Sequence, residues 1–543
     1  MSTFIRPPCD DTASPDIAQP QHDTRSGIWV LAATILGSAM PGIDGTAVNV
    51  ALPVLQRELQ ASSDAAQWVV EGYSLFLSAL ILVGGSLGDH FGRRRMFILG
   101  TIIFAAASAA CAFASSAPIL IGARCIQGIG GALLVPESLA IITASFDERH
   151  RGAAIGTWSG FLAITMAIGP LLGGWFVQAL SWRYVFVINL PLAAIVIALS
   201  MRFIQESRDD AVAKQHIDWT GAAIATVALG LLTYGFIALQ GGASPIAVGA
   251  IALGAVLFVA FVYVERHSRG PMIPLGIFRS GDFTVSNIYT LLLYAALGGA
   301  LFFVPFNLIN VQHYTPTAAG AALLPMILIM FIASRWSGGL VARVGARGPL
   351  TIGALIAAVG FVLFAFTGIG RSYWTSFFPA VLVLGIGASI FVAPLTTTVM
   401  NSAPPEHAGS ASGINNAVSR VAGLLAIALL GIVIVFAAHA ALPRYDSALP
   451  AAIRHVLAAD SLLSGRAPDR GIPADQRPAA ERAAALAHDA GFRDAMLISA
   501  ALAAFSAVIA FTMLSGRSSR AQAGRRKEGQ GPPSLNQGAR PAQ

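Results

Sequence analysis

Three ionisable side chains lie inside long apolar runs of the sequence, where a charge is costly. Asp44 falls within the run 27–51, and Arg124 and Glu137 fall within 118–144. If both runs cross a membrane, Asp44 lies about 13 Å and Arg124 about 10 Å below the same surface, at a rise of roughly 1.5 Å per residue. A carboxylate at that depth needs a charged partner or water, and it can take up and release protons. The pattern indicates proton chemistry inside a membrane.

Each of these residues also has a simpler interpretation. Asp44 could pack against Asn49 and the neighbouring backbone, and its pairing with Arg124 could be purely structural. Glu137, in the inner half of its run, is a second candidate proton site or a structural link to another helix. Glu71, near the outer end of the run 66–88, could bind a cationic compound or simply be hydrated at the membrane surface.

The rest of the chain must position these groups, and its composition is that of an integral membrane protein. Of its 543 residues, 55% are hydrophobic and 11% are charged. In soluble domains about a quarter of the residues are charged. About fourteen apolar runs are long enough to span a bilayer as helices. They cover 27–51, 66–88, 96–115, 118–144, 152–178, 182–203, 219–239, 245–264, 284–308, 316–342, 349–368, 374–399, 411–437 and 494–514.

The basic residues predict the orientation of these helices. The net charge of +7 comes from arginines and lysines in short loops rather than on one face, which argues against nucleic-acid binding. They gather in alternate loops, so both termini are expected in the cytoplasm. The segment 438–493 also carries arginines, but acids balance them, and a long segment can cross regardless of charge. We expect it to lie outside, with one or two short helices.

The sequence shows no enzyme constellation. It contains no phosphate-binding loop, so nucleotide hydrolysis is not indicated as an energy source, and its histidines lack the spacing of metal ligands. We therefore expect no cofactor and no metal, with a proton gradient as the energy source.

The loop that joins the second and third runs carries the most specific motif. It reads Gly85-Ser86-Leu87-Gly88-Asp89-His90-Phe91-Gly92-Arg93-Arg94-Arg95. It resembles the loop signature of the major facilitator superfamily, which follows the second helix of that fold. The resemblance implies a gating hinge formed by Gly85, Asp89, Gly92, Arg93 and Arg94 rather than a cargo site, although a generic basic hairpin would have a similar composition.

Three further motifs resemble the fourteen-helix drug:proton antiporter branch of that superfamily. Residues 42–53, which include Asp44, resemble its first-helix signature, and Arg124-Cys125-Ile126-Gln127-Gly128-Ile129-Gly130 resembles its fourth-helix motif. In the fifth run, Gly169, Pro170, Gly173 and Gly174 match the antiporter motif, except that Thr165 replaces its first glycine. The branch implies that Asp44 and Arg124 face each other from adjacent helices and that the fifth helix resists leakage.

An internal repeat supports two related halves. The segment beginning at His150 aligns with the one beginning at His407, and Gly128 and Gly130 align with Gly385 and Gly387, all at an offset of 257. We predict an all-α membrane protein of the major facilitator fold. It would comprise a disordered cytoplasmic start (1–26), two six-helix halves (27–216 and 269–514), an inserted helix pair (217–268) and a disordered cytoplasmic tail (515–543).

The resemblance implies a proton-coupled exporter of hydrophobic or cationic drugs in the plasma (inner) membrane, working by alternating access. The expected partners are small drugs or cations, protons and lipid, and the need for a periplasmic adaptor stays open. Aromatic and amide side chains suit flat cations, and the candidate cargo residues are Glu71, Gln127, Asn189, Tyr294 and Asn307. An exporter of one endogenous metabolite and a transporter-like membrane sensor are the alternatives.

Overall fold

The computed structural model describes residues 24–514, except 147, 209–217, 240–243, 269–272, 274, 338–339, 403–407, 448, 460–461 and 469–470. The described chain is helical, and each of the predicted apolar runs coincides with a helix or a broken helix. Among the described residues, thirteen helices are long and apolar enough to cross a membrane. The run at 152–178 corresponds to α5, which is not among these thirteen. Of the expected terminal segments 1–26 and 515–543, residues 1–23 and 515–543 lie outside the described residues, and residues 24–26 form the start of a helix.

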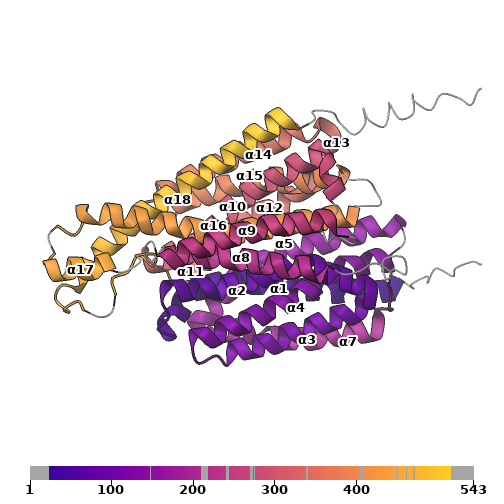
Figure 1. The fold of residues 1–543 in the computed structure, drawn as a ribbon, viewed down its shortest axis with the longest axis horizontal. Helices are drawn as coiled ribbons and strands as arrows, with labels where there is room; N and C mark the ends of the chain where they lie inside the picture. Colours follow the sequence, from indigo (N-terminus) through magenta and orange to yellow (C-terminus); the bar gives the residue numbers. More distant parts are fainter. Residues whose placement is uncertain are drawn as a thin grey trace, which may run out of the picture.

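The chain forms two stacked helical halves with a helix pair beside them (Figure 1). The first half consists of α1 (Thr24–Glu58), α2 (Ser63–Phe91), α3 (Arg93–Ala112), α4 (Ala117–Ser145), α5 (Glu148–Ala179), α6 (Tyr184–Val187) and α7 (Asn189–Phe203). The pair consists of α8 (Trp219–Leu239) and α9 (Pro245–His267).

The second half contains more broken helices than the first. A short 3₁₀ turn, η2 (Leu275–Arg279), leads into it. Its helices are α10 (Gly281–Asn310), α11 (Pro316–Ala321), α12 (Leu324–Ser337), α13 (Leu340–Val344), α14 (Arg347–Ala365), α15 (Phe377–Asn401), α16 (Ala408–Ala441), α17 (Ala451–Ala459) and α18 (Arg477–Met513), with the turn η4 (Leu442–Arg444) after α16.

The two halves repeat the same packing. In the first half α4 packs on α2 and α3, and α1 packs on α5 and α7; in the second half α15 packs on α12 and α14, and α10 packs on α16 and α18. The glycines of the sequence repeat explain how. A Cβ on Gly128 would meet the Tyr73 backbone oxygen of α2 at 2.5 Å, and one on Gly385 would meet the Met326 Cα of α12 at 2.8 Å. Glycine at these positions lets the helix backbones approach closely.

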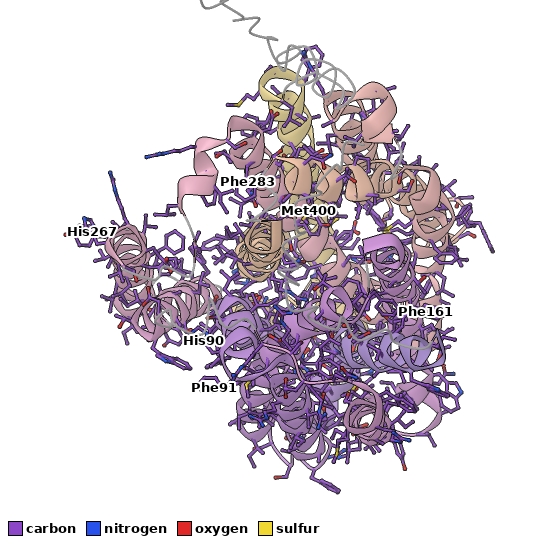
Figure 2. The ribbon with its side chains drawn as sticks, turned by 90° about the vertical axis from the view of Figure 1, so that its right-hand side faces the viewer. His90, Phe91, Phe161, His267, Phe283 and Met400 are labelled. Atoms are coloured by element: carbon purple, nitrogen blue, oxygen red, sulfur yellow. The ribbon has the colours of Figure 1, made fainter. Side chains whose placement is uncertain are left out.

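The inserted pair lies against one flank of the bundle. α8 packs on α9 and contacts both α2 and α16, so it bridges the two halves. Leu229 of α8 belongs to a small apolar cluster with Leu75 of α2 and Leu424 of α16. Seen end-on in Figure 2, His267 at the end of α9 lies at the periphery of the molecule. The expected boundaries of the pair, at 216–217 and 268–269, touch residues outside the description.

The ends of the bundle differ, and we name them by what they carry. The hinge end carries the turn between α2 and α3 and faces the viewer in Figure 2, where His90 and Phe91 are labelled. The α17 end is the opposite one. There α16 continues to Ala441 and α18 begins at Arg477, so both helices extend into the segment 438–493 and, with α17, enclose a small apolar core of their own. This projection is visible beyond the bundle in Figure 1.

Candidate functional site

Asp44 is the centre of a buried polar network that joins four helices. Its side chain is 1% exposed, and its Oδ2 accepts a hydrogen bond from Nη1 of Arg124, which is 0% exposed. Its Oδ1 accepts one from Nε2 of Gln127 at 2.9 Å and one from Nδ2 of Asn189 at 3.3 Å. The same two amides donate to Ser108 Oγ on α3, at 2.9 and 3.2 Å. An ionised carboxylate therefore satisfies donors from α4 and α7.

Arg124 is held in place by more than Asp44. Its Nε donates to the Val69 carbonyl oxygen of α2 at 2.9 Å, and its guanidinium carbon lies 4.2 Å from the ring centroid of Tyr73. The aromatic face attracts the cation. Its remaining nitrogen, Nη2, is buried and has no partner among the described residues. Arg124 thus keeps one donor free beside the carboxylate.

The network has a chemical consequence. Protonating Asp44 would remove the charge that balances Arg124. Leaving a buried charge without its partner destabilises the structure by about 3–5 kcal/mol. The cost falls if the site opens to water or if another anion replaces the carboxylate. The ion pair therefore links the charge on Asp44 to any movement that separates α1 from α4.

The sequence and the structure divide the residues of this network differently. The pairing of Asp44 with Arg124 was implied by the motifs, whereas Gln127 and Asn189 were expected in a cargo pocket and here hold the oxygens of Asp44. Cargo contact by either amide stays a prediction. Ser108 and Tyr73 escaped the sequence analysis, because a serine and a tyrosine inside apolar helices carry no local signal.

Glu137 lies next to the hinge motif rather than next to Asp44. It is 1% exposed on α4, and its carboxyl group occupies the space where a side chain on Gly88 of α2 would be. One turn away along α2, a Cβ on Gly85 would meet the Cβ of Pro136 at 3.5 Å. Because Gly85 and Gly88 have no side chains, Pro136 and Glu137 of α4 can pack directly against the end of α2.

The hinge turn is held by an acid that the sequence analysis missed. Gly92 has φ of +107°, a left-handed conformation that favours glycine. Oε1 of Glu206, in the segment after α7, accepts a hydrogen bond from the Arg94 backbone N–H at 3.0 Å, and Oε2 lies 3.6 Å from Nε of Arg95. The Arg93 N–H donates to the Ser207 carbonyl oxygen at 2.9 Å.

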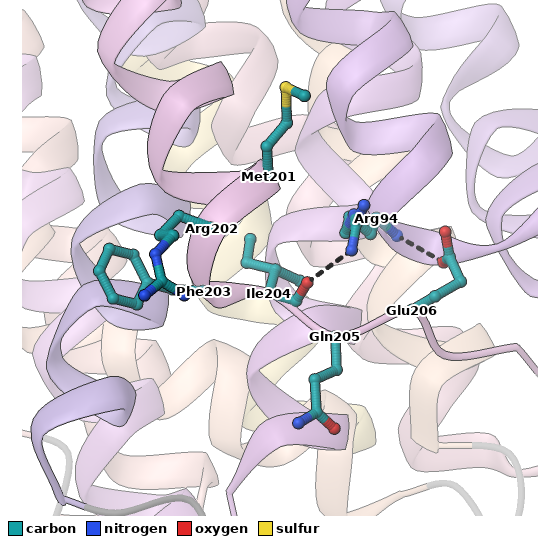
Figure 3. A pocket seen from close by; sticks show the side chains of 7 residues that line it. All are labelled: Arg94, Met201, Arg202, Phe203, Ile204, Gln205 and Glu206. Carbon is teal, nitrogen blue, oxygen red and sulfur yellow. Dashed lines mark hydrogen bonds between the residues drawn. The ribbon is translucent and has the colours of Figure 1, made fainter.

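Glu206 thus caps the first turn of α3, where backbone N–H groups lack partners within the helix. The Arg94 guanidinium adds a bond to the Ile204 carbonyl oxygen at 3.2 Å, and these groups line a cavity of about 490 Å³ (Figure 3). The backbone of Asp89 belongs to α2, but its side chain lies outside the described residues, so its expected bond is not tested.

The glycines of the antiporter motif bring α5 against both halves. A Cβ on Gly173 would meet the Ala47 carbonyl oxygen of α1 at 2.6 Å, and one on Gly169 would meet that of Ile43 at 3.0 Å. One on Gly174 would strike the Pro316 carbonyl oxygen of α11, and one on Gly320 of α11 would strike that of Pro170. The fifth helix therefore packs closely against α11 of the second half near the α17 end.

The departure from that motif at Thr165 is accommodated by a glycine on the other helix. A Cβ on Gly42 of α1 would lie 3.4 Å from Thr165 Oγ1. Thr165 is buried and donates its hydroxyl to the Leu162 carbonyl oxygen at 2.8 Å, so its polar group is satisfied within α5. The close packing of α1 and α5 survives the substitution.

The remaining cargo candidates are spread across the molecule. Glu71 of α2 is fully buried, Tyr294 of α10 is half-buried against the main core, and Asn307 of α10 is fully buried. Asn307 accepts a hydrogen bond from Gln312 at 3.4 Å. No hydrogen bond among the described residues joins these three, and their cargo contact stays a prediction. Among the described residues, no group of three or more potential ligands could hold a metal ion.

Comparisons with known proteins place this architecture in a family. The sequence profile of the Major Facilitator Superfamily matches residues 34–427. Multidrug resistance protein Stp of Mycobacterium tuberculosis (strain CDC 1551 / Oshkosh) is 34% identical over 80% of this chain and 81% of its own length. The tetracenomycin C resistance and export protein of Streptomyces glaucescens is 32% identical over 76% of this chain and 77% of its own. The methylenomycin A resistance protein of Bacillus subtilis is 32% identical over 76% and 89%.

Solved structures agree on the fold. A bacterial homologue of the human lysosomal transporter Spinster, in an inward-facing and unoccupied conformation, superposes with a TM-score of 0.61 at 17% identity, covering 91% of this chain and 99% of that one. A D-xylose–proton symporter gives 0.57 at 14% identity, over 90% and 98%. With two repeated halves, an inserted pair and the matched profile, the chain is a membrane transporter that belongs to the major facilitator superfamily.

Proposed function

We propose that this transporter is a proton-coupled exporter of hydrophobic or cationic drugs that works by alternating access. The observation that carries the proposal is the buried ion pair of Asp44 and Arg124, because its charge balance cannot change without a change in structure. The names of the relatives support the drug-export part, since Stp is called a multidrug resistance protein and the Streptomyces glaucescens relative a resistance and export protein.

In this mechanism Asp44 alternates between a proton and Arg124. While the pair is intact and α5 closes on α11, the α17 end is sealed. When that end opens, water reaches Asp44, the proton enters, and Arg124 is released to the solvent-filled path. Return to the closed state expels the proton toward the hinge end and restores the ion pair. A cationic cargo competes with the proton for the same carboxylate, which gives exchange without a further device.

The orientation is part of the proposal. The arginines of the hinge turn favour a cytoplasmic hinge end, and the projection at 438–493 would then lie outside the cell, with both termini inside. The membrane would be the plasma membrane, and the proton gradient across it would supply the energy with no cofactor. A periplasmic adaptor is not required by this scheme, although the projection would be the surface to meet one.

A transporter dedicated to one endogenous metabolite is the alternative in the same class, because the fold alone does not determine which compound is transported. Resistance profiles of cells with and without the gene separate the two. Protection against several unrelated drugs supports the proposal, whereas an unchanged profile together with accumulation of a single internal metabolite supports the alternative. A sensor would transport neither.

The coupling itself is tested in sealed vesicles. We expect an imposed pH gradient to drive uptake of a cationic dye by the purified wild-type protein. Asp44→Asn, which keeps the shape of the side chain, should lose this gradient dependence while still inserting and folding. Asp475→Asn removes an exposed carboxylate near α17 and should behave as wild type. Gradient-driven uptake by Asp44→Asn at the wild-type rate would rule out Asp44 as the coupling residue.

A further inference from the structure

Glu71 is the most isolated buried carboxyl group that the structure describes in full. It is 0% exposed, and neither Oε1 nor Oε2 has a hydrogen-bond partner among the described residues. Burying an ionised carboxylate without a partner is so costly that the group takes a proton instead. Glutamate is therefore neutral at this position in the conformation described, which distinguishes it from the paired Asp44.

The face of α2 that carries Glu71 is turned toward the other half. At 3.6 residues per turn, Gln67, Ser78 and Leu82 lie about one, two and three turns from Glu71 on the same face. Leu82 lies 2.9 Å from where a Cβ on Gly413 of α16 would be. Leu75, one turn from Glu71, packs with Leu424 of α16. Ser78 Oγ is also buried without a partner among the described residues.

The charged groups on the helices around α2 are engaged elsewhere. Arg124 of α4 holds Asp44 of α1, and Glu137 of α4 lies at the hinge end beside Gly88. α8 contains no charged residue. Arg420 of α16, about one turn before Leu424, lies near Tyr73, and it forms no hydrogen bond to either carboxyl oxygen of Glu71. No described cation therefore compensates an ionised Glu71 in this conformation.

The contact between α2 and α16 joins the two halves, so it must change when they move against each other. We infer that Glu71 is a second proton-carrying site, which holds a proton while α2 and α16 are packed together and releases it when they part at the hinge end. On release the O–H bond of the carboxyl breaks, the proton passes to water on the hinge-end side, and a cationic group of the cargo balances the carboxylate left behind.

This inference rests on the proposed proton coupling and adds one proton to each cycle. Purified protein in vesicles, with a pH-sensitive dye inside and a fluorescent cationic cargo, gives the number of protons exchanged per cargo. Glu71→Gln mimics the neutral carboxyl and should lower that number by one relative to the wild type, while cargo still moves. Glu71→Asp should restore it, and Asp475→Asn should not change it.

The outcomes separate the two proposals. If the wild type exchanges protons and Glu71→Gln gives the same ratio, the second site is refuted and Asp44 alone carries the coupling. If the wild type exchanges no protons for cargo, the proposed function fails, and the inference fails with it.

Infrared difference spectroscopy of the purified protein on cargo addition provides a direct readout that does not depend on transport. The wild type should lose absorption of protonated carboxyl groups, and Glu71→Gln should lack the part of this loss that comes from Glu71 while keeping the part that comes from Asp44. Persistence of the full band loss in that variant assigns the proton to another residue and overturns the inference.

Discussion

At the scale of the residue, Arg124 and Asp44 hold each other in a buried ion pair. The guanidinium of Arg124 donates to the carboxylate, and the ring of Tyr73 helps to hold the guanidinium in place. The depth of Asp44 and Arg124 could be estimated from the sequence because helix rise is constant. The amides of Gln127 and Asn189 could not be assigned to Asp44, because their contacts depend on how α1, α4 and α7 are rotated about their axes.

Arg124→Ala should shift the pH profile of transport. Without the guanidinium, the carboxylate of Asp44 loses the buried ion pair of the closed state, so the step that restores this pair is altered. The pH profile of gradient-driven uptake in vesicles measures the shift. Arg454→Ala removes an exposed arginine of α17 and should leave the profile unchanged. A profile in Arg124→Ala that coincides with the wild-type profile would separate Arg124 from coupling.

At the scale of the element, glycines determine how close helices approach and where the halves meet. Gly174 of α5 against α11 is the clearest case, since any side chain there would strike the Pro316 carbonyl oxygen. Gly174→Ala should destabilise the closed α17 end by about 1–3 kcal/mol, the usual cost of overpacking. Labelling of Ala319→Cys on α11, which is fully buried at this contact, should then be faster from the outside.

Gly122→Ala is the matched control, because a Cβ there meets no atom within 4 Å. Both variants would be made in a background with the native cysteines replaced. Equal labelling rates in Gly174→Ala and Gly122→Ala would show that the α5–α11 contact does not limit opening.

The hinge turn between α2 and α3 should affect the transport of all cargos alike. Asp89→Ala and Glu206→Ala each should lower the maximal rate for every cargo by a similar factor, with cargo affinity kept, because the turn positions helices and does not touch cargo. Glu206→Gln should be milder, since its amide oxygen can still accept the Arg94 N–H. Gln205→Ala, at the neighbouring exposed position, is the control. Loss of one cargo with the others untouched would place these residues in a binding site instead.

The turn also shows the limit of motif reading. The signature identified Gly92 and the arginines, since the positive φ and the basic charge are properties of the local sequence. Glu206 lies more than a hundred residues further along the chain, and only the packing of α7 beside α3 brings it to the turn. The repeat of Gly128 and Gly385 could be read from the sequence. Each glycine is identified by the motif around it on a single helix, so no contact between distant segments has to be known.

At the scale of the whole molecule, the helix count followed from hydropathy, since apolar length fixes which segments can span a bilayer. The two-fold repeat followed from motifs that align at a constant offset. The length of α18 did not follow. Its first residues are polar and alanine-rich, so hydropathy began the helix near 494, whereas packing with α17 extends it to Arg477. Side-chain contacts rather than hydropathy decide the structure of this projection.

The proposed topology predicts where a protease cuts. Added to intact cells, it should cleave within 438–493 and spare the segment 202–216, because the α17 end would face outward. Mass spectrometry of the fragments reads out the sites, and opened cells serve as the control in which both segments can be cut. Cleavage at 202–216 together with protection of 438–493 would invert the molecule in the membrane.

Cargo-induced proton release from the purified protein is the most direct test of the central claim that Asp44 exchanges a proton for cargo. In weakly buffered detergent solution, adding a cationic drug to the wild type should acidify the medium, with an amount of acid that saturates with the drug. Asp44→Asn should still bind the drug but should not release the proton that Asp44 releases in the wild type. Asp475→Asn should match the wild type. Proton release by Asp44→Asn equal to that of the wild type would contradict the account.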